Sequence, residues 1–574
     1  MQAFCNIQYL GKGYRKTEWN RVSVFGEATD NETHRTEYAY DADNRVTQVK
    51  YDGSDSTKVN YSYDKLNRIT QRSVTNGAAY ATQYGYVQGA AAYGSNATTP
   101  LINAITQCSG ANALNFSYTY DSRGNITSET RNGVTTTYEY DALGQLVRVN
   151  DPNDKTVGNT GTTWIYAYDR GGNILSKTAY AYTTGEPDLD VITKLYEYND
   201  ANWKDKLTKF DGHTITYDAI GNPLNDGTWT YTWQAGRQLK SMSKVEGGDT
   251  IMMEFTYNHA GLRTKKVKKV NGTVAETTEY ILNGKNVVEL IHTNHATSVT
   301  NRLHFFYDTQ DKQAMVEFNG AKYSYAYNLQ GDVIGIIDST GNTVVQYSYD
   351  AWGKPIGTTA SSTLTTELAE LNPFRYRAYV WDKETELYYL RSRYYALEIG
   401  RFLSFDFFSF CPRDFEQESG IICTNSFAYC ENNAVNRVDS DGGWWKSLKK
   451  ALKQVAVVAL CVAVIAVVSV ATGGAGTLAL AAGYTAAQGI AVAESIAIAS
   501  AAVSATAYFA STDRPRSNQV QNKQYGEVMK RLGIQRTDPM WRIIHDAIHK
   551  KGFVGGFNEL YKFAKALKNQ LKGK

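Results

Sequence analysis

The chain has 574 residues, 42% hydrophobic and 20% charged, so it exceeds one ordinary domain and can bury a large core. Its 42 tyrosines and 47 glycines against 9 prolines favour turn-rich β structure. The net charge of +3 excludes a uniformly basic protein, but residues 515–574 hold 13 Lys and Arg against 4 Asp and Glu. That balance of +9 leaves −6 for the rest, which predicts that the tail is a separate unit.

The six cysteines lie at positions 5, 108, 411, 423, 430 and 461, without a CxxC pair or zinc-like spacing. This pattern excludes a disulfide framework and predicts free thiols, with the cluster at 411–430 as a weaker alternative metal site. We expect no metal centre and no cofactor.

The first 20 residues contain no apolar stretch of the kind found in a secretory signal peptide. Export therefore requires another route. A complete repeat unit follows almost at once, at residues 36–47 (TEYAYDADNRVT), so we expect the chain to be part of a longer repeat series.

A repeated pattern of Tyr-x-Tyr followed by Asp or Asn is the strongest internal signal of the sequence. The pattern recurs at residues 38–41, 61–64, 118–121, 138–141, 166–169, 196–199, 325–328 and 347–350. Two variants of it stand at 216–218 (Thr-Tyr-Asp) and 255–258 (Phe-Thr-Tyr-Asn). Tyr-x-Tyr places two rings on one face of a strand, and the following Asp or Asn caps a turn. Each unit is thus predicted to be one hairpin-sized step of a solenoid-like antiparallel sheet.

A glycine often follows the Asp or Asn, at Gly124, Gly144, Gly172, Gly221, Gly261, Gly331 and Gly353, where we expect a positive φ. An ordinary β-sandwich is the alternative fold, but repeats in near register favour the solenoid. The tyrosines also suit a stacking platform for sugars or single-stranded nucleic acid, although rings that recur in every repeat first indicate a core.

Residues 372–406 read NPFRYRAYVWDKETELYYLRSRYYALEIGRFLSFD and do not repeat. Apolar positions alternate over 387–395, which predicts half-buried strands with aromatic and ionic cross-strand pairs. The segment resembles the core-domain signature of the rearrangement-hot-spot (RHS) family of YD-repeat proteins. The resemblance implies a β-shell around a hollow interior over residues 1–371, closed by a core domain over 372–443.

The RHS resemblance also implies self-cleavage by core aspartates near a D-P-x-G-type ending, which releases the segment that follows. The matching residues here are Asp406, in GRFLSFD, and Asp439 with Asp441, in NNAVNRVDSDGG. Two carboxylates brought together can share a proton and act as acid and base. The chain departs from the family pattern, which predicts weak cleavage near Gly442. The departures are Leu397, Phe407, Ala434 and Ser440 in place of Pro, Ala378 and Glu386 in place of Gly, and Gly443 in place of an apolar residue.

Residues 444–514 change composition abruptly. Positions 455–471 carry no charge and match the thickness of a bilayer core as a helix, and a second apolar stretch over 490–510 contains only Glu494. The two stretches predict a hydrophobic helical hairpin over 455–510, either in a membrane or packed inside the shell.

Residues 515–574 show apolar positions at helical spacing, which predicts a small basic α-helical domain. His545 and His549, four residues apart, are candidate catalytic residues of an effector, but the glutamate of a metalloprotease motif is absent. The basic helices favour nucleic acid or an anionic membrane as partner.

The resemblance and the order of segments predict an RHS-type polymorphic toxin, whose shell delivers a variable C-terminal effector and whose cell of origin makes an immunity protein. We expect it to be secreted or associated with a cell surface or membrane. Two alternatives remain: a non-enzymatic adhesive surface protein anchored by 455–510, and a truncated silent RHS element. Two enzymatic activities are possible for such a chain: self-cleavage by the core and nuclease activity of the tail.

Overall fold

The computed structural model describes residues 5–9, 14–20, 33–52, 54–88, 98–108, 114–188, 190–406, 425–443 and 445–447. All of them belong to one compact unit, Met1–Val457. The predicted hairpin over 455–510 and the basic tail lie outside the described residues. Within the described part of the chain, no helix is long and apolar enough to cross a membrane.

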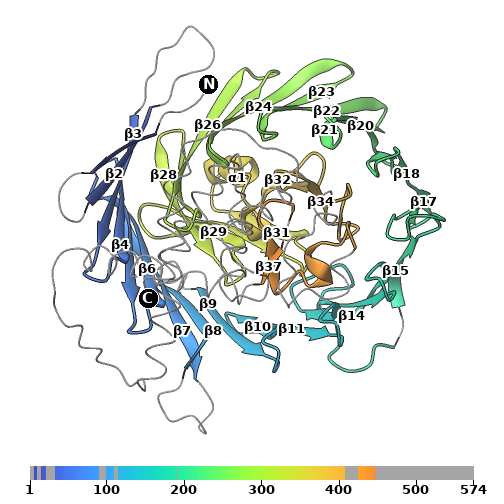
Figure 1. Ribbon diagram of the computed structural model, residues 1–574, viewed down its shortest axis with the longest axis horizontal. Helices are drawn as coiled ribbons and strands as arrows, with labels where there is room; N and C mark the ends of the chain where they lie inside the picture. Colours follow the sequence, from blue (N-terminus) through green and yellow to red (C-terminus); the bar gives the residue numbers. More distant parts are fainter. Residues whose placement is uncertain are drawn as a thin grey trace, which may run out of the picture. The chain divides into compact units, whose positions relative to one another are not determined.

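The first of two large sheets is a meander in which each strand pairs antiparallel with the next along the chain (Figure 1). Its strands are β1 (Cys5–Tyr9), β2 (Tyr14–Asn20), β3 (Thr33–Tyr40), β4 (Val46–Tyr51), β5 (Thr57–Tyr63), β6 (Ile69–Asn76), β7 (Ala78–Gln88), β8 (Thr98–Cys108), β9 (Leu114–Tyr120), β10 (Ile126–Arg131), β11 (Val134–Tyr140), β12 (Leu146–Asp151), β13 (Thr162–Tyr168), β14 (Ile174–Ala181), β15 (Asp190–Glu197), β16 (Lys209–Phe210) and β17 (His213–Thr214).

The second large sheet continues the same meander. Its strands are β18 (Thr216–Tyr217), β19 (Pro223–Asn225), β20 (Thr230–Gln234), β21 (Gln238–Glu246), β22 (Asp249–Tyr257), β23 (Arg263–Val270), β24 (Thr273–Asn283), β25 (Asn286–Asn294), β26 (Val299–Tyr307), β27 (Gln313–Phe318), β28 (Ala321–Tyr327), β29 (Val333–Ile337), β30 (Thr343–Tyr349) and β31 (Pro355–Ala360). The predicted antiparallel β architecture is therefore confirmed for the repeats.

The repeated Asp or Asn caps most of the turns, as the sequence predicts; at 196–199 the next residue, Asp200, accepts the turn N–H groups instead of Asn199. At Asp141 the carboxylate Oδ1 accepts the backbone N–H groups of Leu143 and Gln145, at 2.9 and 2.8 Å. The Gly144 N–H donates to the Asp141 carbonyl at 3.1 Å, which closes the turn. Gly144 has φ +81°, so the expected positive φ is confirmed at this position. The same capping recurs at Asp64, Asp169, Asp218 and Asp350.

The two tyrosines of a repeat have different tasks. The first ring enters the core: Tyr138 and Tyr166 are buried. The second ring is only partly buried. Its hydroxyl donates to a backbone carbonyl in the previous repeat, that of the first residue of the strand that begins after the turn of that repeat. Tyr140 bonds Ile126 O at 2.7 Å and Tyr168 bonds Leu146 O at 2.6 Å. Each repeat is thereby tied to the one before it, which gives the Tyr-x-Tyr pattern a structural reason.

Alanine substitutions at two turn glycines distinguish the cost of backbone strain from the cost of a steric clash. Gly144 and Gly353 have φ of +81° and +92°, so alanine at either position costs about 1 kcal/mol of strain. A methyl group at Gly353 would also lie 2.5 Å from the ring of Tyr376, whereas at Gly144 the nearest atom is 4.0 Å away. We expect Gly353→Ala to cost about 1–3 kcal/mol more than Gly144→Ala in urea unfolding. Equal losses would show that Gly353 does not pack against Tyr376.

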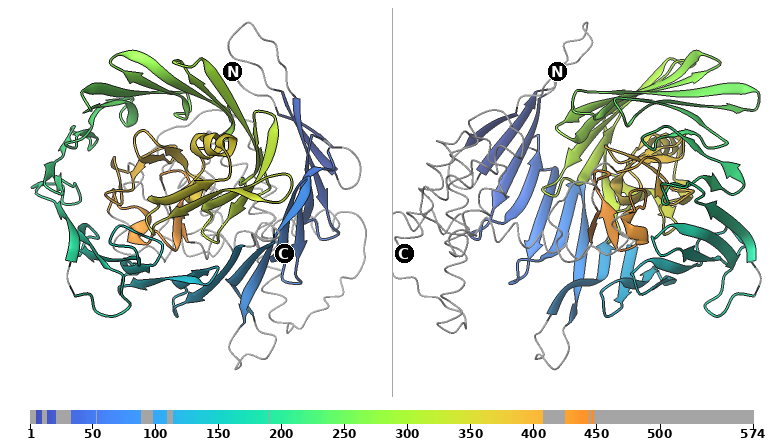
Figure 2. Two further views of the ribbon diagram at one scale, coloured as in Figure 1. Left: turned by 180° about the vertical axis from the view of Figure 1, so that it is seen from behind. Right: turned by 45° about the vertical axis from the view of Figure 1, so that its right-hand side comes forward.

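The segment after β31 forms small elements that both large sheets surround (Figures 1 and 2). They are α1 (Thr363–Leu371), the 3₁₀ turns η3 (Tyr376–Ala378) and η6 (Cys430–Asn432), a sheet of β32 (Val380–Asp382), β33 (Leu387–Tyr389), β34 (Tyr394–Ala396) and β35 (Arg401–Phe402), and a pair of β36 (Arg437–Asp439) and β37 (Trp445–Ser447). Ser362 caps α1, because its hydroxyl accepts the Thr365 N–H.

The prediction of half-buried strands over 387–395 is wrong. All residues of β33 and β34 are buried. Tyr388 and Tyr395 pack into one hydrophobic cluster, and Leu387 and Tyr394 pack into another. Residues of the large sheets pack against both faces of the small sheet. Successive residues of β33 and β34 therefore point alternately into two different hydrophobic clusters, and neither face of these two strands meets solvent.

Candidate functional site

Residues 432–436 fasten the last core segment to three successive repeat turns. Asn432 Nδ2 donates to the carbonyl of Gly172 at 2.7 Å, and Asn433 Nδ2 donates to the carbonyl of Gly144 at 2.8 Å. Asn436 Oδ1 accepts the backbone N–H of Ile126 at 2.7 Å. The shell therefore fixes the position of β36, which follows directly.

Asp406 and Asp439 meet at one guanidinium. Arg393 Nη2 lies 3.4 Å from Asp406 Oδ2 and 3.5 Å from Asp439 Oδ2, and all three side chains are buried. Asp406 follows β35, Asp439 ends β36 and Arg393 precedes β34, so three separate segments bring the charges together. Two of the three aspartates predicted from the sequence thus share a site.

The Gly442 peptide is held at the same place. Arg393 Nε donates to the Gly442 carbonyl, and Asp439 Oδ1 accepts the Gly442 N–H at 2.8 Å. Gly442 has φ +78°, and a methyl group there would lie 2.7 Å from the Leu390 carbonyl oxygen. Glycine is therefore required for the chain to pass this close to the segment 390–393.

Asp441 has a different position from the other two aspartates. Its side chain is exposed, and its Oδ1 accepts the Gly443 N–H at 3.1 Å. Its backbone carbonyl accepts the hydroxyl of Ser392 at 2.6 Å. Asp441 thus contacts the nitrogen of the Gly442–Gly443 peptide bond without joining the buried pair.

Burial raises the pKa of Asp439 to about 6, while the nearby Arg393 guanidinium opposes that rise. Asp439 therefore holds its proton in mildly acidic solution. Asp406 and Asp439 both lie at a guanidinium that donates to the Gly442 carbonyl, so groups able to act as acid, base and electrophile gather around one arginine.

Sequence reasoning did not single out Arg393. The only feature of the sequence that could have indicated it is its place in SRYY, where a basic residue stands next to two tyrosines in an aromatic segment that becomes buried. His545 and His549 lie outside the described residues.

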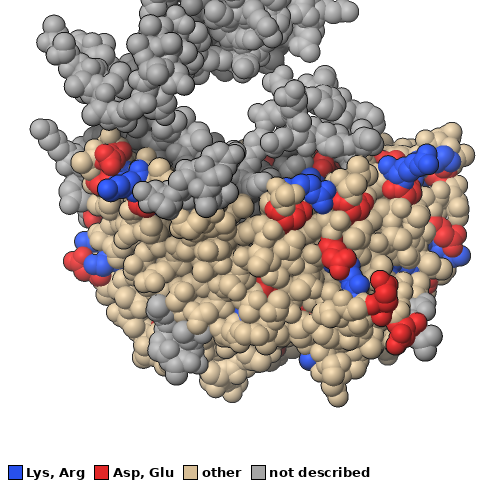
Figure 3. Space-filling view, turned by 90° about the horizontal axis from the view of Figure 1, so that it is seen from below, with Lys and Arg blue, Asp and Glu red and all other residues tan. Residues whose placement is uncertain are grey.

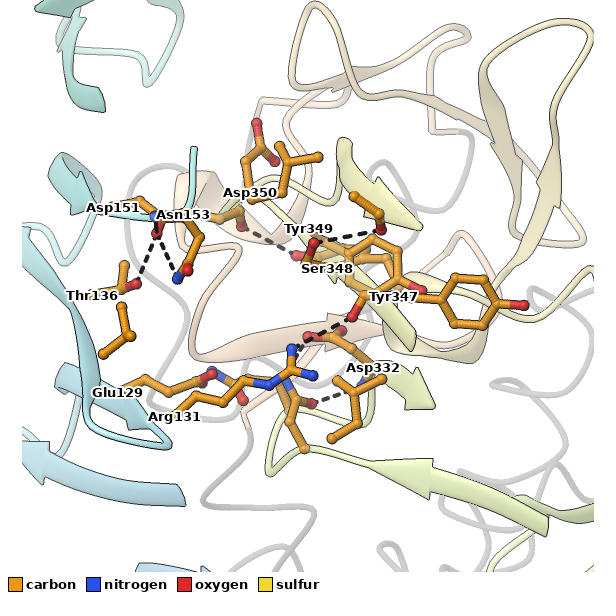
Figure 4. Close-up of a pocket in the computed structure, with 18 of the residues that line it drawn as sticks. Glu129, Arg131, Thr136, Asp151, Asn153, Asp332, Tyr347, Ser348, Tyr349 and Asp350 are labelled. Carbon is orange, nitrogen blue, oxygen red and sulfur yellow. Dashed lines mark hydrogen bonds between the residues drawn. The ribbon is translucent and has the colours of Figure 1, made fainter. Parts of the chain in front are cut away.

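A second candidate site is a cavity of about 350 Å³ lined mainly by β10, β11, β30 and β31, with one residue each from β9, β12 and β29 (Figure 4). Glu129 enters it, and Glu129 Oε2 accepts the side-chain amide of Gln330 at 2.8 Å. Burial raises the pKa of Glu129 to about 7 and that of Asp350 to about 6. Asp332 on the same wall pairs with Arg377 at 3.0 Å.

We expect Glu129→Gln to stabilise the protein at pH 8. The carboxyl pKa is about 7 in the folded state and about 4.5 when unperturbed, so the folded state binds the extra proton between these values and loses stability as pH rises through them. The gain at pH 8 should be about 2 kcal/mol, with allowance for solvent around the carboxylate. Urea unfolding of both proteins from pH 4 to 8 measures it. A difference that does not change with pH would contradict the assignment.

The face seen in Figure 3 carries acidic and basic side chains next to one another in small groups. Exposed strand residues pair in the same manner, as in Lys194 with Asp211 at 2.6 Å and Lys209 with Glu197 at 2.8 Å. The described part of this face has no broad patch of one sign, so it offers no basic strip to a nucleic acid.

Residues 95–435, more than half of the chain, match the family model described as teneurin YD-shell. The tRNA nuclease WapA of Bacillus subtilis (strain 168) is 36% identical over 305 residues, and the tRNA3(Ser)-specific nuclease WapA of Bacillus spizizenii is 35% identical over 305 residues. Each alignment covers 53% of this chain and 12% of the relative, so the matched part is about one eighth of those proteins.

A solved structure with the same architecture is the crystal structure of TcdB2-TccC3-Cdc42. It superposes with a TM-score of 0.51 and 17% sequence identity, over 78% of this chain and 23% of that chain. At this identity the likeness shows a shared fold.

Proposed function

Because this chain belongs to the teneurin YD-shell family, we propose that it is the shell and core of a bacterial polymorphic toxin that cuts itself after Gly442. The observation that carries the proposal is the Arg393 guanidinium, which contacts Asp406, Asp439 and the Gly442 carbonyl together. The names of three curated relatives, WapA tRNA nucleases, support an effector that acts on nucleic acid, and the name of a fourth, double-stranded DNA deaminase toxin A, supports the toxin class.

In the proposed cleavage, water attacks the carbonyl carbon of Gly442. Asp406 takes one proton from that water, and the hydroxyl adds to the carbon. Arg393 Nε holds the carbonyl oxygen and stabilises the negative charge that develops on it. Asp439 gives its proton to the Gly443 nitrogen as the C–N bond breaks, which leaves a carboxylic acid on Gly442 and an amine on Gly443. The new carboxylic acid then ionises and its proton returns to Asp439, so the Gly442 carboxyl ends as a carboxylate.

The raised pKa of Asp439, about 6, favours it as the acid of the pair. The short hydrogen bonds of residues 432–436 to the shell favour cleavage in the folded chain only, because those bonds place β36 and the peptide that follows. Asp441, which accepts the Gly443 N–H, positions the leaving nitrogen.

In this proposal the chain has four parts: a repeat shell over 1–371, a core over 372–443, a hydrophobic hairpin over 444–514 and a basic helical effector over 515–574. The effector acts on nucleic acid, with His545 or His549 as general base, and an immunity protein binds it in the cell of origin. The hairpin over 455–510 contacts a membrane, and the protein is secreted or held at the cell surface. The positive balance of 515–574 supports an anionic target.

Expression of the full chain in a bacterium tests the toxin proposal. We expect loss of viability. Co-expression of an immunity gene, expected as a small reading frame directly downstream, should restore viability, and the double change His545→Ala with His549→Ala should abolish the toxicity. A chain that leaves viability unchanged without that reading frame would refute a toxin. Toxicity that persists in the folded double variant would refute catalysis by the histidines and favour action on the membrane.

A further inference from the structure

A second cavity, of about 300 Å³, lies at the seam between the two large sheets, far along the chain from the core aspartates. One wall comes from β6, β7 and β8, and the other comes from the turns that border β27 and β28. Its lining is mostly apolar and aromatic, with Ile69, Tyr84, Tyr86, Ile102 and Leu329 among the residues. An apolar body therefore fits between the walls.

Three cations line the same cavity, and carboxylates pair with two of them. Arg68 pairs with Asp64 at 2.6 Å, and Arg72 pairs with the fully buried Asp308 at 3.0 Å. Lys312 is the third. Its ammonium forms neither a hydrogen bond nor an ion pair within the described part of the chain, and the ring of Tyr327 lies 5.1 Å away.

The charged form of Lys312 is disfavoured by its surroundings, because its ammonium is removed from water and has no carboxylate partner in the residues that the structure describes. Burial lowers the pKa of its ammonium, and the attraction of Asp308 only partly offsets this effect. The Tyr84 hydroxyl lines the same cavity and likewise has no hydrogen-bond partner among the described residues. Among the three cations, the one without a described carboxylate partner thus faces the mostly apolar cavity together with the Tyr84 hydroxyl.

We propose that this cavity binds a small amphipathic carboxylate, with its anionic group on Lys312 and Tyr84 and its alkyl or aryl body against the apolar wall. One negative charge neutralises the one cation that lacks a partner. Because the walls belong to different sheets, the bound molecule holds the two sheets together, and binding stabilises the folded shell.

Octanoate and its neutral counterpart octanol test the site by calorimetric titration of the full chain. We expect saturable binding of one octanoate per chain, weakened about tenfold or more in Lys312→Met because the charge-assisted contact is lost. Octanol should bind the wild type and Lys312→Met equally, and Lys312→Arg should retain octanoate binding. Thermal unfolding should show a rise in Tm with octanoate in the wild type that Lys312→Met lacks.

Two results would overturn the proposal: no saturable octanoate binding to the wild type at millimolar concentration, or octanoate binding by Lys312→Met as tight as that by the wild type. Lys312→Gln, which keeps a polar end, replaces Lys312→Met if the latter does not fold. Unchanged far-ultraviolet circular dichroism of the variant without ligand is the folding control. Tyr84→Phe should weaken octanoate binding by less than the lysine change, since it removes a single neutral donor.

Discussion

Asp439→Asn is expected to slow self-cleavage by about 10²–10⁴-fold, because the amide cannot give a proton to the Gly443 nitrogen. Asp406→Asn removes the base and should have an effect of the same size. Asp441→Asn should slow cleavage much less, since its exposed carboxylate only positions the leaving nitrogen. The rate of fragment appearance on a denaturing gel, after refolding of each variant, measures all three.

The pH dependence gives a separate test of the acid. With the Asp439 pKa at about 6, wild-type cleavage should be faster below pH 6 than above it, because only the protonated carboxyl acts as the acid.

Arg393→Lys keeps a positive charge but loses the geometry that reaches Gly442 O and both carboxylates, so it should also cleave slowly. Efficient cleavage by both aspartate variants would remove Asp406 and Asp439 from the reaction.

Asp382→Ala is expected to cost about 3–5 kcal/mol of folding free energy, because it leaves the buried guanidinium of Arg263 without its carboxylate. Both terminal nitrogens of Arg263 donate to the Asp382 carboxylate, with Nη2 at 3.0 Å, and Lys266 Nζ lies 3.2 Å from it. The Asp382 side chain is fully buried. This cluster seats β32 of the core on β23 of the second sheet.

The neighbouring residue provides the control for that change. Lys383 pairs with Glu370 at 3.1 Å, but both side chains are about half exposed. Lys383→Ala should therefore cost about 0–1 kcal/mol. Urea unfolding followed by tryptophan fluorescence compares the two variants. Equal and small losses would show that the Arg263 cluster does not hold the core segment in place.

The repeats could be predicted from the sequence because their interactions are local. The Asp141 cap, the positive φ of Gly144 and the ring of Tyr138 all act within one hairpin, so the residue pattern alone specifies them. The bond from Tyr140 to Ile126 joins adjacent repeats, and nothing in the pattern distinguishes it from a second core ring.

The candidate site was only partly predictable, because its parts come from distant segments. The resemblance to RHS proteins indicated Asp406 and Asp439, but it did not indicate that Arg393 joins them. Glu129 stands in the polar stretch Thr-Ser-Glu-Thr of β10, which reads as a solvent-facing edge. Glu129 bonds Gln330 and lies near the charge of Asp332, and an alternation with a period of two does not predict contacts with residues so distant in the sequence.

The intact mass of the purified full chain after folding at pH 5.5, with amino-terminal sequencing of any small fragment, tests self-cleavage at Gly442. We predict a fragment that begins Gly443-Trp444-Trp445 and ends at Lys574, together with a large fragment that ends at Gly442. A chain that keeps its full mass, or a fragment that begins elsewhere, would contradict cleavage by the Arg393, Asp406 and Asp439 site.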